Sequence, residues 1–124
     1  MPLTTSRAAA SSLAKALESE AKSTGKNSFL VVYASLINGT SWCGDCRSAE
    51  PVLEKKFGGE EEAATVVYAG DKLEWRKPEN PWRKAPFSVT NLPTLIKITP
   101  DGKWEKLVEV DVYNQKKLDA FIGF

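Results

Sequence analysis

The chain has 124 residues, of which 42% are hydrophobic and 27% charged, a composition typical of a globular domain rather than a disordered chain. Seventeen Lys and Arg residues against sixteen Asp and Glu give a net charge of +1, which supplies no general attraction to nucleic acid or anionic membranes. Histidine is absent, which excludes His-dependent catalytic triads and His-ligated metal sites. The length predicts one domain over residues 1–124.

No stretch of the sequence suits a membrane span. The longest apolar run, residues 29–37, is well short of the ~20 residues that a transmembrane helix needs. The first residues lack the apolar core of a secretory signal. Residues 1–17 contain no acid and weakly resemble a transit peptide, but they merge into a helical pattern, which favours an ordinary first helix. The expected location is therefore the cytoplasm.

The predicted elements begin with an amphipathic helix. Residues 7–22 are rich in Ala, Leu, Glu and Lys, and Leu13, Leu17 and Ala21 recur at a spacing of four. Residues 29–34 then form a continuous apolar run, which is typical of a central strand buried on both faces. The chain thus opens with a helix followed by a buried strand.

The rest of the chain predicts a mixed sheet. Helices are expected at 45–57 and 114–122, strands at 64–69, 95–99 and 104–110, and a long polar connection at 70–91. A Pro-Asp-Gly turn joins the last two strands as a hairpin, and Trp104 and Tyr113 are expected in the sheet and core. This order indicates an α/β fold with a central mixed β-sheet flanked by helices.

The two cysteines, Cys43 and Cys46, form a Cys-X-X-Cys motif between a buried strand and a helix. In an α/β sheet, sites collect at the carboxyl ends of strands, and this spacing places both sulfurs on one helical turn, close enough to bridge. The helix N-terminus stabilises an anion, so the pKa of Cys43 should fall toward about 7. We expect Cys43 to be the exposed nucleophile and the more buried Cys46 to be the resolving thiol, with a Cys43–Cys46 disulfide as the oxidised form.

The two residues between the cysteines modify this site. Gly44 lets the backbone of a partner come close. The helix dipole favours the carboxylate of Asp45, yet its negative charge disfavours the Cys43 thiolate. We therefore predict a less acidic Cys43 than an apolar residue at position 45 would give, and weaker docking of acidic partners.

Other interpretations of these features are weaker. An inert buried pair does not explain the cysteine spacing, and a metal or iron–sulfur site would require two chains to share four thiolates, so no metal is expected. Basic and aromatic residues alternate in 75–83, but Glu74 and Glu79 favour packing and client selection over nucleic-acid binding. The alternative to an enzyme is a non-catalytic adaptor whose cysteines sense redox state and control the binding of a protein partner.

Three motifs carry a resemblance to a known superfamily. The segment Trp42-Cys43-Gly44-Asp45-Cys46 differs from a Trp-Cys-Gly-Pro-Cys box at one position, and Pro51 and Leu92-Pro93-Thr94 match two further prolines. The chain resembles the thioredoxin superfamily in these motifs and in its order of elements. The resemblance implies a thioredoxin-like fold in which a cis Pro93 faces the dithiol. It also implies that Trp42 shields the dithiol and that the Leu92 backbone, with Pro93, holds an extended substrate edge.

A closer resemblance is to the 14-kDa thioredoxin-related proteins, the thioredoxin domain-containing protein 17 family. The residues that carry it are Ser41-Trp42-Cys43, Asp45-Cys46, Ala49-Glu50-Pro51-Val52, Gly70-Asp71-Lys72, Trp75, Pro78, Asn80 and Arg83-Lys84. The chain also shares an enlarged loop, residues 35–41, before the Trp-Cys box. It departs from the family at Gly44, where Pro is typical.

This resemblance implies a monomeric cytosolic disulfide reductase with no bound cofactor, which thioredoxin reductase recharges with electrons from NADPH. Its substrates would be small disulfides such as cystine, and protein disulfides. Thioredoxin has a buried Asp that assists proton transfer to the second Cys, but no acid occurs here between Glu20 and Asp45. Proton removal from Cys46 is therefore expected to depend on water or another group, with residues 70–72 as one candidate region.

Overall fold

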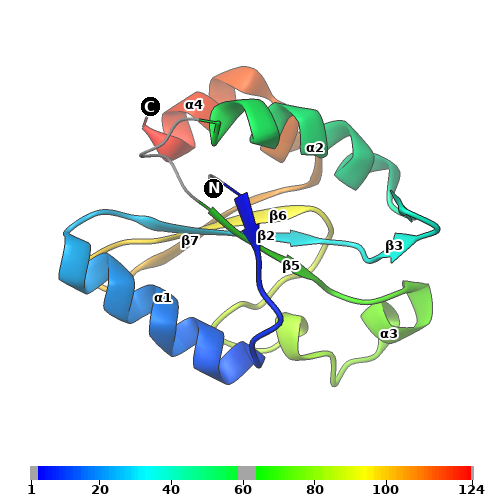
Figure 1. Cartoon of the computed structure of the whole chain (residues 1–124), viewed down its shortest axis with the longest axis horizontal. Helices are drawn as coiled ribbons and strands as arrows, with labels where there is room; N and C mark the ends of the chain where they lie inside the picture. Colours follow the sequence, from blue (N-terminus) through cyan, green and yellow to red (C-terminus); the bar gives the residue numbers. More distant parts are fainter. Residues whose placement is uncertain (1–2, 59–63, 124) are drawn as a thin grey trace.

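A computed structural model describes residues 3–58 and 64–123. Its five-stranded sheet has the order β1-β5-β2-β6-β7 (Figure 1). The strands are β1 (Leu3–Thr5), β2 (Ser28–Tyr33), β5 (Ala64–Tyr68), β6 (Thr94–Ile98) and β7 (Trp104–Val108). The first three run parallel to one another, whereas β6 pairs antiparallel with both β2 and β7. The predicted mixed sheet and its hairpin are confirmed.

Helices cover both faces of this sheet. They are α1 (Ala10–Thr24), α2 (Gly44–Lys56), α3 (Lys72–Arg76) and α4 (Gln115–Ile122). Figure 1 shows α2 and α4 on one side of the sheet and α1 and α3 on the other. Within the described ranges, no helix has both the length and the apolar character to cross a membrane.

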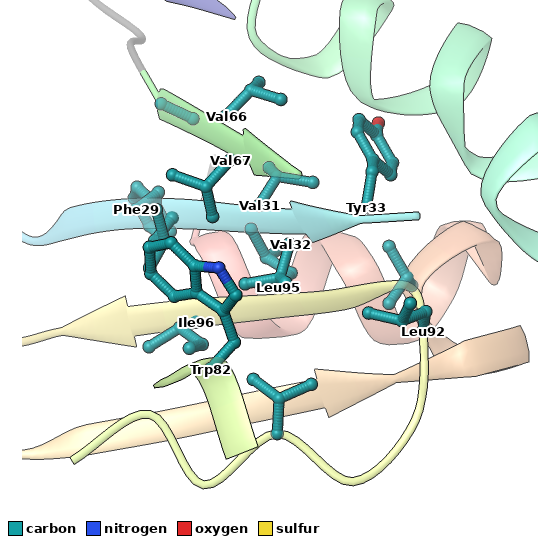
Figure 2. Close-up of a cluster of buried hydrophobic side chains, with 14 of the residues drawn as sticks. Phe29, Val31, Val32, Tyr33, Val66, Val67, Trp82, Leu92, Leu95 and Ile96 are labelled. Carbon is teal, nitrogen blue, oxygen red and sulfur yellow. The ribbon is translucent and has the colours of Figure 1, made fainter. Parts of the chain in front are cut away.

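The core lies around β2, whose six residues are all buried. Its apolar run is continuous because helices cover the sheet on both sides, so neither face needs polar residues. Alternate residues of a strand share a face, which places Phe29, Val31 and Tyr33 together. The rings of Phe29 and Phe57 lie 5.4 Å apart, so this face packs against α2, whose C-cap residue is Phe57. Figure 2 shows this cluster between the strands and the helices.

The long connection predicted at 70–91 contains short helices of its own. Asp71 begins α3 with a capping box: its carboxylate accepts from the Glu74 N–H, and the Glu74 side chain accepts from the Asp71 N–H. A 3₁₀ helix, η1 (Pro81–Arg83), follows, with Asn80 as its N-cap. Side-chain caps rather than apolar periodicity stabilise these short helices, so the apolar pattern of the sequence did not predict them.

Three further differences concern the strands. The enlarged loop 35–41 forms a small two-stranded ribbon, β3 (Leu36–Ile37) with β4 (Thr40–Ser41). The last strand, predicted at 104–110, ends at Val108. Glu109 adopts a φ of 53° and donates its N–H to the Pro93 carbonyl at 2.8 Å, which turns the chain into the 3₁₀ helix η2 (Glu109–Tyr113). The short strand β1 was also missed, since three residues show no periodicity.

Candidate active site

Cys43 is the N-cap residue of α2, directly after the β3–β4 ribbon and Trp42. Its backbone is extended, with φ −96° and ψ 117°, and its carbonyl accepts the first helical hydrogen bond, from the Arg47 N–H at 3.1 Å. Its sulfur accepts a hydrogen bond from the Cys46 N–H at 3.2 Å. The sulfur therefore occupies the position of an ordinary N-cap oxygen, where unpaired helical N–H groups and the helix dipole stabilise an anion.

This environment lowers the pKa of Cys43 to about 7. The largest cause is the hydrogen bond from the Cys46 side chain, and the Cys46 backbone N–H acts in the same direction. Burial and the negative charge of Asp45 oppose them and raise the pKa. Both the lowered pKa and the opposing effect of Asp45 agree with the sequence predictions. A substantial fraction of thiolate is thus present at neutral pH.

Cys46 is fully buried, one helical turn from Cys43. Its sulfur accepts a hydrogen bond from the Ala34 N–H at 3.5 Å, just beyond the end of β2. Its pKa is raised, first by the hydrogen bond that it shares with Cys43 and then by burial. Both cysteines are free thiols in this structure. A half-buried thiol with a lowered pKa beside a buried thiol with a raised pKa is the asymmetry that the predicted nucleophile and resolving roles require, and these roles stay predictions.

The predicted contact residues surround Cys43. The Cys43 thiol donates to the carbonyl of Leu92 at 3.6 Å, and the Leu92–Pro93 peptide bond is cis. The indole N–H of Trp42 donates to the Gly70 carbonyl at 3.1 Å, which fixes this half-buried ring beside the dithiol. Trp42 therefore lies beside the cysteine pair on the same segment, whereas the structure brings Leu92 and Pro93 to it from one distant segment.

The residues between the cysteines lie on the first turn of α2. Gly44 is exposed, and a Cβ there would meet only the Arg47 side chain, at an ordinary contact distance of 3.6 Å. Asp45 accepts a hydrogen bond from the hydroxyl of Tyr113 at 2.7 Å. Tyr113, predicted to be a core residue, is half-buried on η2: it packs against the core, and its hydroxyl also contacts the site. The sequence of a short segment does not indicate whether its aromatic residue packs in the core or contacts a site.

Residues 70–72, the region named for proton transfer, have other contacts. The Gly70 carbonyl accepts hydrogen bonds from Trp42 and from the Ser35 N–H, while exposed Asp71 caps α3. Lys72 places its Nζ 5.9 Å from the centre of the Trp42 ring. This segment therefore supports the tryptophan. Among the described residues, no group of three or more His, Cys, Asp or Glu side chains is placed to hold a metal ion.

Comparison with known proteins gives the family. The family model described as "Thioredoxin domain-containing protein 17-like, thioredoxin domain" matches residues 7–123. The chain belongs to the thioredoxin domain-containing protein 17-like family. Among its relatives, human thioredoxin domain-containing protein 17 is 41% identical over 73 residues, which cover 57% of this chain and 56% of that protein.

Other members of the thioredoxin domain-containing protein 17-like family match longer segments. The thioredoxin-like protein Clot of Arabidopsis thaliana is 37% identical over 91 residues, 69% of this chain and 68% of that protein. A thioredoxin domain-containing protein of Schizosaccharomyces pombe is 31% identical over 119 residues, 89% of this chain and 95% of that protein. The matched segment spans 65% of the rice Clot protein, just under two thirds of its length.

Solved structures confirm the thioredoxin-like fold of this thioredoxin domain-containing protein 17-like chain. The reduced thioredoxin pre-protein of Schistosoma mansoni superposes with a TM-score of 0.66 at 17% identity, over 98% of this chain and 99% of that chain. Fasciola hepatica thioredoxin gives a TM-score of 0.59 at 24% identity, over 99% and 97% of the two chains. The α/β class with a central mixed sheet, predicted from the sequence, is therefore confirmed.

One site residue of this family member had been noted in the sequence without a role. The Ser41 hydroxyl is buried; it donates to the Ala34 carbonyl at 3.3 Å and accepts from the Cys43 N–H at 3.4 Å. It thereby ties the end of β2 to the start of α2 and also lowers the pKa of Cys46. Its position directly before the Trp-Cys box was the available signal.

Proposed function

We propose that this protein is a thiol–disulfide reductase that uses Cys43 and Cys46 as a redox-active dithiol. The observation that carries the proposal is the hydrogen bonding of the Cys43 sulfur at the N-terminus of α2. There the Cys46 side chain and N–H lower its pKa to about 7. A thiol with a pKa near the ambient pH combines a useful thiolate fraction with good nucleophilicity. Membership of the thioredoxin domain-containing protein 17-like family supports the same activity.

The proposed reaction has two steps. The Cys43 thiolate attacks one sulfur of a substrate disulfide; a mixed disulfide forms and the other substrate sulfur leaves as a thiolate. Cys46 then loses its proton and attacks the Cys43 sulfur, which forms the Cys43–Cys46 disulfide and releases the second substrate thiolate. Two electrons pass from the dithiol to the substrate. In this proposal the Leu92 carbonyl, which lies 3.6 Å from the Cys43 sulfur, accepts an N–H from an extended substrate.

The proposal extends to partners and location. Thioredoxin reductase would return the disulfide to the dithiol with electrons from NADPH. The substrates would be small disulfides such as cystine, as well as protein disulfides. We place the protein in the cytoplasm, where it would act as a monomer in redox homeostasis, with neither nucleic acid nor membrane as a partner. The near-neutral charge of the chain supports the exclusion of nucleic acid.

Cystine reduction coupled to NADPH oxidation by thioredoxin reductase tests this function. We expect turnover in the parent protein, none in Cys43→Ser, and a trapped mixed disulfide in Cys46→Ser that intact mass spectrometry detects. Ser48→Ala, an exposed change on the same helix, is the control and should keep parental turnover. Partner binding that depends on oxidation state, without turnover of any disulfide, would instead support a redox-sensing adaptor. The dithiol potential, measured against glutathione, decides between reductant and oxidant.

A further inference from the structure

The second step of the proposed reaction requires a proton acceptor for Cys46, and the inference below rests on that reaction. Cys46 is fully buried and its hydrogen bond with Cys43 raises its pKa, so it does not ionise unaided at neutral pH. The buried strand beneath it carries no carboxylate, since β2 reads Ser-Phe-Leu-Val-Val-Tyr. The acceptor must therefore come from another element or act through a neutral group.

Tyr33, the last residue of β2, supplies an unusual neutral group. Its side chain is 4% exposed, and its hydroxyl oxygen has no hydrogen-bond partner among the described residues. Figure 2 shows the ring directed away from the sheet toward the ribbon of α2. A buried hydroxyl without a partner costs stability, so such groups are rare unless they have a role. The next residue, Ala34, donates its N–H to the Cys46 sulfur, so the end of β2 that carries Tyr33 contacts α2 at the resolving thiol.

Glu50 lies one helical turn beyond Cys46 on α2. Residues four apart share a face of a helix, so Glu50 lies on the same side of α2 as Cys46. Burial is the largest cause that raises the pKa of Tyr33, and the charges of Glu50 and Cys46 are the next two. The charges of Glu50 and Cys46 therefore both raise the pKa of the Tyr33 hydroxyl. Glu50 is itself half-buried, in a position to exchange a proton with solvent.

We propose that the Tyr33 hydroxyl and the Glu50 carboxylate form a proton relay for Cys46. As the Cys46 sulfur attacks Cys43 in the mixed disulfide, its proton passes to the Tyr33 oxygen, and the Tyr33 proton passes to Glu50. The new S–S bond forms, the substrate thiolate leaves, and Glu50 returns the proton to water or to the departing thiolate. Tyr33 is neutral before and after the step, so charge and protons balance.

The charged and titratable groups around the relay define its pH dependence. On α2, Glu54 adds to the effect of burial and raises the pKa of Glu50, whereas Arg47 lowers it. On β5, Tyr68 lies with its ring centre 6.3 Å from that of Tyr33. On η2, which also packs against α2, the Tyr113 hydroxyl is hydrogen-bonded to Asp45. Burial and the second carboxylate, Glu54, therefore both make Glu50 a better proton acceptor than an exposed, isolated carboxylate.

The test separates the two sulfur steps in one experiment. The reduced protein is mixed with one equivalent of the disulfide dithionitrobenzoate. Cleavage of this disulfide releases thionitrobenzoate, whose colour is measured. Attack by Cys43 releases one thionitrobenzoate in a first phase, and attack by Cys46 releases the second. The rates of both phases are measured across the pH range for the parent, Tyr33→Phe, Glu50→Gln and the double variant. Glu20→Gln is the matched control, because it removes the same charge from an exposed position on α1, outside the relay.

At neutral pH, we expect the second phase of each single variant to slow by about a hundredfold, the lower end of what a positioned acid–base group contributes. The first phase should keep its parental rate, and the double variant should be no slower than either single one, since the two groups act as a unit. Alkaline pH should restore the second phase because hydroxide then removes the Cys46 proton. Glu20→Gln should change little.

Three results would overturn the relay. If both variants keep the parental second phase at every pH, the relay is absent while the reductase activity stands. If they slow it equally at every pH and also lower the unfolding midpoint, the residues have only a structural role. If the parent itself shows no second phase, the dithiol reaction fails and the relay fails with it. Tyr33→Phe removes only an unpaired hydroxyl, so its fold should be retained.

Discussion

The hydroxyl of Tyr113 donates a 2.7 Å hydrogen bond to Asp45 Oδ1, and this bond joins η2 to the first turn of α2. The two residues are 68 positions apart in the sequence. The Asp45 carboxylate raises the pKa of Tyr113 chiefly through this hydrogen bond, and its charge also raises the pKa of Cys43. A carboxylate between the cysteines is thus held in place by a contact from the other end of the chain.

Asp45→Asn should make Cys43 more acidic. The substitution removes the negative charge that raises the pKa of Cys43, so this pKa should fall below about 7. The rate of iodoacetamide alkylation, measured against pH, should show its midpoint shifted to lower pH. Tyr113→Phe keeps the carboxylate and should shift the midpoint far less. An unchanged or higher midpoint in Asp45→Asn would show that Asp45 does not act on the thiolate.

Gly44→Pro should stabilise the protein. Gly44 is the first residue of α2, where proline is favoured, and the extended backbone of Cys43 before it suits a following proline. The free energy of unfolding, measured with urea, should rise by about 0.4–1 kcal/mol because the unfolded chain loses freedom. Gly70→Ala should do the opposite, since Gly70 has φ +112° and a Cβ would lie 2.7 Å from the Glu74 Cβ. A destabilised Gly44→Pro variant would contradict the prediction.

Asn80→Ala should destabilise the segment behind Trp42. The buried Asn80 amide donates to the carbonyls of Ala69 at 2.7 Å and Glu74 at 3.1 Å, and its oxygen accepts from the Trp82 N–H at 3.0 Å. Loss of all three partners should cost about 2–3 kcal/mol in the free energy of unfolding. Urea unfolding is the measurement.

The control for Asn80→Ala is Asn114→Ala. Asn114 caps the exposed start of α4 by accepting from the Lys117 N–H at 3.1 Å. Its removal should cost about 1 kcal/mol, the usual value for an N-cap. Equal losses in the two variants would show that burial of Asn80 adds nothing beyond its capping role.

The lowered pKa of Cys43 makes stability depend on pH. Folding lowers this pKa from 9.0 to about 7, so between these values the unfolded state binds more protons than the folded state. The contribution of Cys43 to the free energy of unfolding should therefore rise as pH increases from about 7 to 9, and be lost as pH falls through about 7. Urea unfolding of the reduced protein at several pH values, against Cys43→Ser, isolates this slope. Parallel curves would exclude a stabilised thiolate.

The main elements could be predicted because their signals are local. Apolar residues at a spacing of four mark α1, and an unbroken apolar run marks β2. The prediction of an element was wrong where the same local sequence pattern fits two different backbone structures. The run 104–110 reads as one strand, yet Glu109 turns away after Val108 because its N–H bonds to the Pro93 carbonyl, a group outside the segment.

The candidate site also has features that local sequence predicts and features that depend on packing. The cysteine spacing and its place at a helix start are local, so the asymmetry between Cys43 and Cys46 could be predicted. The Leu92 carbonyl was assigned from a resemblance to known proteins, and the sequence alone does not bring it within 3.6 Å of Cys43. The Tyr113 contact with Asp45 and the unpaired hydroxyl of Tyr33 gave no signal, because each depends on how separate elements pack.

The sequence by itself determined the class of fold, the dithiol and the acidic thiol at a helix N-terminus, because periodicity, spacing and the helix dipole act within one short segment. Only the tertiary structure decided which groups surround that thiol. Residues far apart along the chain meet when the sheet and helices pack, and burial then changes how strongly charges and hydroxyl groups act on one another. For this protein, that packing directs the buried Tyr33 ring toward α2 and places Tyr113 against Asp45.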